Sequence, residues 1–289
     1  ILAMSTSVIW IKAGTTHPFV VAALRLLIAC VLLTPIFLRD RARHRELFTA
    51  EHLRRTLLPA AVLAAHFLSW TAGARMTGSA QASLIVNMVP VAVPFLLFYV
   101  TGERINRLEI AGTALAISGV LVLTLRDAIA GSGLTGVGNL VCFASMLMFA
   151  LYITLGRRNR DFPTVWLYVV PVYFTAGIIC LVVSLPWIGS FDAGSGREWI
   201  MIAGLAVVPT ILGHSLLNNA VRHLRGQLVS LCTVGQFVFA GAMGWIFFRE
   251  SPAPLFYAAS ALVVAGIVIV VLNTPASPAV LQPDQSQAP

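Results

Sequence analysis

Four ionisable side chains interrupt long apolar stretches of the sequence: Lys12, Arg25, His66 and His214. Such a group at the centre of a bilayer-spanning helix costs roughly 2.5–3.5 kcal/mol, and those found there commonly mark a solute pathway. Trp70 follows His66 by one helical turn, and Asn218 follows His214 by the same spacing. Each pair therefore shares one helix face, and each could present hydrogen-bonding groups to a solute.

We interpret His66 and His214 as pseudo-symmetric partners that face one central cavity, where neutral imidazoles would give and accept hydrogen bonds. The alternative is that each imidazole only holds neighbouring helices together. Lys12 and Arg25 lie toward the outer halves of their spans, where either could attract the carboxylate of a solute. The alternative for these two is that the side chain extends along its helix to the membrane surface.

Three further side chains within the apolar stretches could donate hydrogen bonds to a solute: Ser83, Ser230 and Gln236. Small polar residues also pack helix against helix, which is the structural alternative for the two serines. Asn87 precedes Pro90 and Pro94, and the backbone bonds that proline cannot make permit a bend with free carbonyls. Asn87 is therefore a candidate for the cavity wall, or else part of a structural kink alone.

The composition predicts an all-α integral membrane protein. The 289 residues are 58% hydrophobic and 10% charged, whereas soluble domains carry about 25% charged residues. Residues 274–289 are rich in Pro and Gln and predict a disordered tail. Since a span needs about 20 apolar residues, the rest accommodates ten, the first expected to lack its start. The predicted spans are 1–14, 18–38, 56–76, 79–101, 108–125, 135–156, 163–187, 199–221, 226–248 and 252–273.

The cations between these spans predict the orientation in the membrane. Alternate loops carry thirteen arginines on one side and four on the other, which places the first set and the C-terminal tail in the cytoplasm. The same rule accounts for the net charge of +8, so no nucleic-acid partner is expected. We expect a multi-pass protein of the bacterial inner membrane, with bilayer lipid and a small-molecule substrate as its partners.

An internal repeat divides the predicted helices into two sets. When the chain is shifted by 147 residues, residues 77–123 align with residues 224–270 without a gap, so that Glu103 meets Glu250 and Gly119 meets Gly266. Each half, 1–125 and 126–273, holds five spans, and an odd number forces the second half to enter the membrane inverted. The sequence therefore predicts two inverted five-helix repeats, an architecture of secondary transporters whose substrate site lies between the halves.

The order of several short segments resembles the ten-helix, EamA-type branch of the drug/metabolite transporter superfamily. The segments are MSTSVIWIK (4–12), ALRL (23–26), SLIVNMVP (83–90), FALY (149–152) and residues 230–250. Two positions depart from the family pattern: Met4 stands where Trp is frequent, and Gln236-Phe237 replaces a second proline. The resemblance implies export of metabolites such as amino acids, including aromatic ones, along helices that would include Trp10.

What the sequence lacks narrows the function further. None of its eleven acidic residues falls in the middle of a predicted span, so a central cavity should prefer zwitterionic or anionic solutes over cations. Walker, HExxH and GxSxG patterns are absent, so we expect neither a cofactor nor a familiar hydrolase. The predicted function is a secondary transporter, which a single chain could form as a monomer. The alternative is an intramembrane enzyme using His66 and His214 on a lipid-borne substrate.

Overall fold

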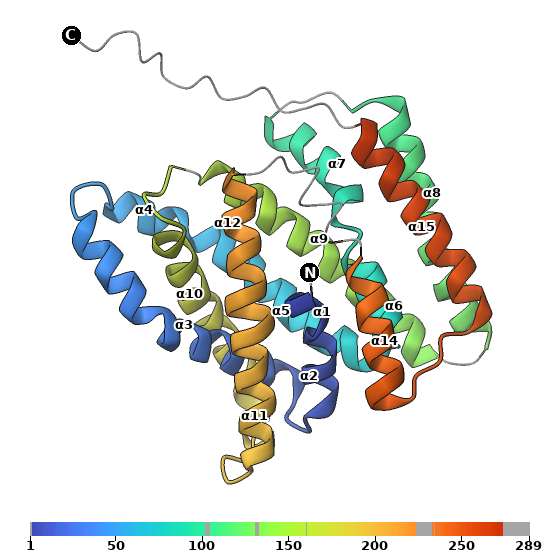
Figure 1. The fold of residues 1–289 in the computed structure, drawn as a ribbon, viewed down its shortest axis with the longest axis horizontal. Helices are drawn as coiled ribbons and strands as arrows, with labels where there is room; N and C mark the ends of the chain where they lie inside the picture. Colours follow the sequence, from blue (N-terminus) through green and yellow to red (C-terminus); the bar gives the residue numbers. More distant parts are fainter. Residues whose placement is uncertain are drawn as a thin grey trace.

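Helices form every regular element in the computed structural model, which describes residues 2–101, 105–130, 133–159, 161–223, 233 and 235–273 (Figure 1). The elements of the first half are α1 (Leu2–Ser5), α2 (Ser7–Ala13), α3 (Pro18–Arg43), α4 (Ala50–Arg55), α5 (Leu57–Met76), α6 (Ser79–Val86), α7 (Val89–Thr101) and α8 (Arg107–Ile129). Those of the second half are α9 (Gly133–Arg158), α10 (Val165–Ser184), η1 (Leu185–Ser190), α11 (Gly196–Leu205), η2 (Ala206–Ser215), α12 (Leu216–His223), α14 (Gln236–Phe248) and α15 (Pro254–Asn273).

These elements confirm a helical multi-pass membrane protein. Eight helical stretches in the described residues are long and apolar enough to cross a bilayer, and two shorter apolar ones cover Leu2–Ala13 and Gln236–Phe248. Together they correspond to the ten predicted spans. The start of the predicted span 226–248 lies outside the described residues.

Three of the ten spans are interrupted near the middle of the bundle. Thr6 separates α1 from α2, and Asn87 with Met88 separates α6 from α7 just before Pro90. The eighth span is π-helical through η2, which contains Pro209. Since proline lacks the backbone N–H of a regular helix, both proline-containing breaks have a local cause. Such breaks are common where helices line a functional site.

The main helix pairs join one half of the chain to the other. They are α3 with α10, α5 with α9, α6 with α14, α8 with α15, and α1 and α2 with η2 and α11. The first span of one half corresponds to the first span of the other, and so on. When each helix is replaced by its counterpart, every pair becomes itself or another of these pairs. The packing is therefore that of two five-helix repeats related by a pseudo-two-fold axis.

The fifth span of each half packs closely on its counterpart, and Figure 1 shows α8 and α15 side by side. A Cβ atom at Gly112 would lie 2.7 Å from the Gly266 carbonyl oxygen, and one at Gly119 would lie 2.7 Å from the Ala259 carbonyl oxygen. Small residues let backbones approach in this way when no hydrophobic effect drives association. Glycine rather than a larger residue is required at these positions.

We expect Gly266→Leu to lower the free energy of unfolding by roughly 1–3 kcal/mol, because a side chain there meets backbone atoms that cannot move aside. Thermal unfolding in detergent measures the effect. Ala265→Leu is the matched control, since Ala265 is exposed on the same helix. Equal stability of the two variants would contradict the close contact between α8 and α15.

Candidate solute site between the two halves

Arg25 is a fully buried cation at the interface of α3 and the π-helical segment η2. Its Nε and Nη2 atoms donate to the Thr210 hydroxyl oxygen at 3.0 and 2.8 Å, and the guanidinium carbon lies 4.2 Å from the centroid of the Phe67 ring. The Thr210 hydroxyl in turn donates to the Leu205 carbonyl, 2.8 Å away. Arg25 is therefore fixed inside the bundle and does not extend to the membrane surface.

The charge of Arg25 has no acidic counterpart in the part of the chain that the structure describes. No ion pair there includes Arg25, and its Nη1 atom is buried without a hydrogen-bond partner. A buried charge without a partner is costly. An anionic group reaching Nη1 would remove that cost, so the residue is suited to bind a carboxylate.

The structure brings the two predicted histidines together beside Arg25. The ring centroids of His66 and His214 are 6.2 Å apart. His66 stacks on Phe149 with centroids at 4.7 Å, and His214 lies edge-on to Phe67 and Phe149 at 5.2 and 5.3 Å. We call Arg25, His66, Phe67, Phe149 and His214 the central cluster. Its members come from α3, α5, α9 and η2, so both halves of the chain contribute.

The two imidazoles differ in their hydrogen bonds. His66 Nδ1 lies 3.0 Å from the Ser145 carbonyl oxygen and 2.8 Å from the Ser145 hydroxyl oxygen. A bond to a carbonyl requires the proton on Nδ1, which leaves Nε2 of the neutral ring as an acceptor. His214 Nδ1 is buried without a partner. One imidazole is therefore fixed by the protein, and the other keeps a nitrogen available.

In the described structure Trp70 and Asn218 make their side-chain hydrogen bonds to atoms other than the two imidazole rings. Trp70 Nε1 donates to the Ser7 hydroxyl at 3.1 Å, which turns the indole toward α2. Asn218 accepts a bond from the Tyr152 hydroxyl at 3.1 Å and donates to the His214 carbonyl at 2.8 Å. The spacing of one helical turn is as predicted, but Phe67 and Phe149 supply the rings around the histidines.

The remaining candidates also have contacts within the protein. Asn87 donates to the carbonyl of buried Ser83 at 2.7 Å, and Gln236 Nε2 lies 3.9 Å from the Met4 sulfur. Trp10 Nε1 donates to the Thr6 hydroxyl at 3.1 Å. The bonds of Asn87 and Trp10 lie at the interruptions of the fourth and first spans, and Gln236 begins α14. Ser230 lies outside the described residues.

Lys12 is neutralised by Glu250 at one end of the bundle, so its charge is not free for a solute. The two side chains form an ion pair of 2.5 Å, and the other carboxylate oxygen of Glu250 accepts the Ser79 backbone N–H at 2.6 Å. Burial raises the pKa of Glu250, but the hydrogen bonds from Lys12 and Ser79 outweigh it and hold the pKa below its ordinary value. Glu250 thereby joins α2, α6 and the end of α14.

We call this end, formed by residues 14–17, 77–78, 185–195 and 249–253, the arginine-poor end. Glu198 accepts hydrogen bonds there from the backbone N–H groups and hydroxyls of Thr15 and Thr16, at 2.5–3.2 Å. Arg75 donates to the carbonyls of Ile11, Gly14 and Thr16 at 2.6–2.9 Å. Neither residue was a sequence candidate, because its partners are distant in the chain.

The opposite end has an analogous contact. Arg55 binds both carboxylate oxygens of Asp161 at 2.6 and 2.7 Å and also donates to Asn159 and to the Arg158 carbonyl. The hydrogen bond from Arg55 lowers the pKa of Asp161. Arg55, at the start of the third span of the first half, thus binds the turn between the first two spans of the second half. Glu198, at the start of the third span of the second half, binds the turn between the first two spans of the first half at the arginine-poor end.

A bundle of inverted repeats with a buried polar cluster between them is typical of membrane transporters. The model of the EamA-like transporter family matches residues 1–125 and 136–272, and the chain belongs to that family. An "uncharacterized transporter" of Archaeoglobus fulgidus (strain ATCC 49558 / DSM 4304 / JCM 9628 / NBRC 100126 / VC-16) is 25% identical over 270 residues, covering 92% of this chain and 91% of that protein.

The fold is also that of a solved structure described only as the crystal structure of a protein. It superimposes with a TM-score of 0.67 over 94% of both chains, at 18% sequence identity. This likeness concerns the fold alone. Neither the family nor the archaeal relative supports an intramembrane enzyme.

Proposed function

We propose that the protein is a secondary transporter that exports small amphipathic metabolites carrying a carboxylate, foremost amino acids with aromatic or other apolar side chains. The observation that carries the proposal is the buried Nη1 of Arg25, which has no partner in the described structure and lies in a cluster with two imidazoles and two phenyl rings.

The central cluster suits both parts of such a solute. The carboxylate would bind Arg25 Nη1, and His214 Nδ1 would hydrogen-bond to a second polar atom. Phe67 and Phe149 would contact the side chain, since aromatic rings favour offset or edge-on neighbours. Because neutral imidazoles and phenyl rings carry no charge, the solute side chain need not be charged. The site would therefore accept apolar and aromatic side chains.

Transport would proceed by alternating access around this site. The site is shared between halves whose main contacts cross the pseudo-two-fold axis, an arrangement typical of carriers that rock one half against the other. The repeats are taken as 1–125 and 126–273, and one chain supplies the whole path. The ion pair of Lys12 with Glu250 and the bonds of Glu198 and Arg75 would keep the arginine-poor end closed.

Counterflow in liposomes tests the function. Purified protein in vesicles preloaded with unlabelled tryptophan or phenylalanine should accumulate the labelled amino acid saturably and unchanged. Vesicles loaded with tryptophan amide test the carboxylate requirement, and empty vesicles correct for leak. Chemical conversion of the solute without flux would favour the enzyme alternative, and absence of saturable flux across an amino-acid panel would reject this substrate class.

The arginine-poor end would face the outside of a bacterial inner membrane, with the C-terminal tail in the cytoplasm, because loops with few cations are the ones translocated. We therefore expect a membrane-impermeant maleimide applied to intact spheroplasts to label Ser195→Cys but not Arg222→Cys. Both variants are made after replacement of the four native cysteines. Permeabilised cells should label at both positions, and labelling only of Arg222→Cys in intact spheroplasts would reverse the orientation.

A further inference from the structure

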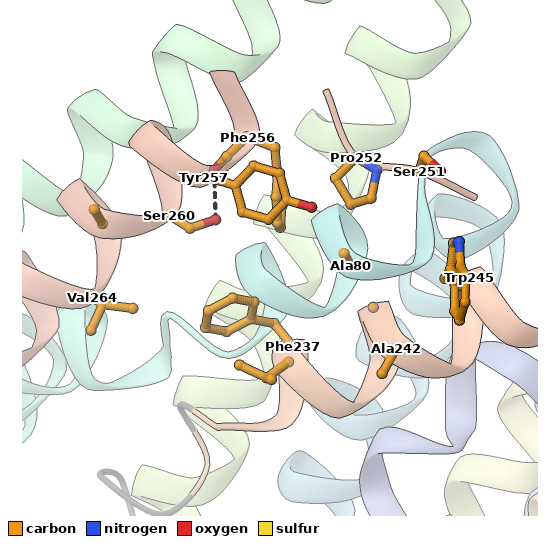
Figure 2. A pocket seen from close by; sticks show the side chains of 13 residues that line it. Ala80, Phe237, Ala242, Trp245, Ser251, Pro252, Phe256, Tyr257, Ser260 and Val264 are labelled. Carbon is orange, nitrogen blue, oxygen red and sulfur yellow. Dashed lines mark hydrogen bonds between the residues drawn. The ribbon is translucent and has the colours of Figure 1, made fainter. Parts of the chain in front are cut away.

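A cavity lies between α14 and α15 near the arginine-poor end, and none of the central-cluster residues lines it. It has a volume of about 730 Å³ and borders α6 at Ala80. Figure 2 shows Phe237 of α14 and Phe256, Tyr257 and Ser260 of α15 around it, with Trp245 on the α14 side. Its volume is within the range of small-molecule sites, roughly 300–1,000 Å³.

The lining has no charged side chain, and its polar side chains are Trp245, Ser251, Tyr257 and Ser260. The Ser260 hydroxyl donates to the Phe256 carbonyl at 2.7 Å, the bond drawn in Figure 2, and four of the lining residues are aromatic. A zwitterionic solute that suits the central cluster would lose its hydrogen bonds to water here without replacement. The occupant must be apolar over most of its length.

The length of the cavity agrees with one leaflet of the bilayer. Its lining on α15 runs from Phe256 to Val264, a rise of about 12 Å in a helix, and Ser251 and Pro252 extend the lining beyond the start of the helix. The hydrocarbon core of a bilayer is about 30 Å thick, so one leaflet contributes about 15 Å. An extended acyl chain of a phospholipid has this length and is apolar throughout.

Two of the aromatic residues that line the cavity are exposed on the surface of the bundle. Trp245 and Tyr257, which line it, are 54% and 63% exposed, and both residue types favour the level of the lipid head groups. Their exposed position lets a lipid enter sideways. Arg249 follows α14 two positions before the lining residue Ser251, with an exposed side chain and a left-handed backbone (φ 56°). Its charge complements a lipid phosphate.

The packing of the neighbouring helices explains why protein does not fill this space. α14 packs on α6, where a Cβ at Gly241 would lie 3.0 Å from the Ala80 Cβ, while α15 packs along α8. Phe237 and Phe256 bridge the two helices with ring centroids 6.3 Å apart. Because each helix packs along a different partner, protein side chains do not fill the space beside this bridge.

We infer that this cavity is a phospholipid site in which one acyl chain occupies the groove between α14 and α15 and the phosphate lies at Arg249. The lipid belongs to the leaflet at the arginine-poor end. The bound lipid fills the space between α14 and α15, which pack on different neighbouring helices.

Native mass spectrometry of the full chain, released from nanodiscs that mix phosphatidylglycerol and phosphatidylcholine, tests this site. The wild type should retain one tightly bound phospholipid, enriched in phosphatidylglycerol. Ala242→Phe/Ala261→Phe, which fills the groove from two exposed positions, should lose that lipid. Arg249→Gln should lower its retention and the preference for phosphatidylglycerol roughly tenfold, the effect of one charge-assisted hydrogen bond.

Ala265→Phe, an exposed position of α15 that does not line the cavity, is the matched control and should keep the lipid. Thermal unfolding shows that each variant is folded. Unchanged lipid retention in the folded Ala242→Phe/Ala261→Phe variant would overturn the proposal. So would loss of a dimer in that variant with lipid retention unaltered, because the groove would then be an interface between two copies of the chain.

Discussion

Arg25→Gln is expected to weaken the transport of amino acids roughly 10- to 100-fold. The substitution leaves a shorter, uncharged side chain that can still donate hydrogen bonds, and it removes the only charge of the central cluster. A hydrogen bond to a charged group contributes about 1.5–3 kcal/mol, and each 1.4 kcal/mol changes an affinity tenfold. The half-saturation concentration in the counterflow assay measures the loss.

Amide derivatives separate binding from packing in this experiment. An amino-acid amide has no carboxylate, so its transport should be slow in the wild type and nearly unchanged in Arg25→Gln. Arg25→Lys should restore part of the acid transport, because it keeps the charge but not the planar fork that binds two oxygens. If Arg25→Gln remains folded and reduces acid and amide equally, Arg25 supports the structure and does not bind the solute.

Glu250→Gln is expected to open the arginine-poor end. The amide can still accept the Ser79 N–H, but the ion pair with Lys12 is lost. Loss of one partly buried charge-assisted bond should raise the open population roughly tenfold. Spin labels at Gly189→Cys and Ser251→Cys, both exposed at this end, should then show a longer distance in double electron–electron resonance than in the parent protein.

Acidification should have the same effect on the parent protein. The pKa of Glu250 is lowered in the closed end, so the ion pair stabilises closure fully above the ordinary glutamate pKa. This contribution is lost as the pH falls through the lowered value. Long distances should therefore appear only in acid below the ordinary pKa, and Glu250→Gln should not respond to pH in that range.

A double-mutant cycle provides the control for this pair. Lys12→Gln should lengthen the distance as Glu250→Gln does, and the double variant should add little to either, because both remove one interaction. Additive effects, or an unchanged distance in Glu250→Gln, would show that the ion pair does not keep the end closed.

The spans were predictable because membrane insertion imposes a long apolar stretch that composition alone reveals. The proximity of His66 to His214 followed from the repeat and from helical spacing. The partner of Lys12 was not predictable in this way, because Glu250 lies 238 positions away and outside the aligned helix interiors. Hydropathy locates a span along the chain but does not say which neighbour a polar side chain meets.

The sequence also did not predict which side of each helix faces which neighbouring helix. His66 and Trp70 share a helix, yet one faces α9 and the other α2. On α15 the small residues Ala261 and Ala265 are exposed, whereas Gly266 makes the close contact with α8. Nearly uniform hydrophobicity around a membrane helix removes the signal that orients helices in soluble proteins.

The π-helical segment η2 also bears on how the two halves diverged. The halves align at a shift of 147 residues, but the two central histidines are 148 apart. A π turn takes up one residue more than an α turn, and η2 contains His214. An offset of one residue turns a side chain of an ordinary helix by about 100°. The extra residue of a π turn compensates for such an offset, so the two imidazoles face each other despite their unequal positions in the repeats.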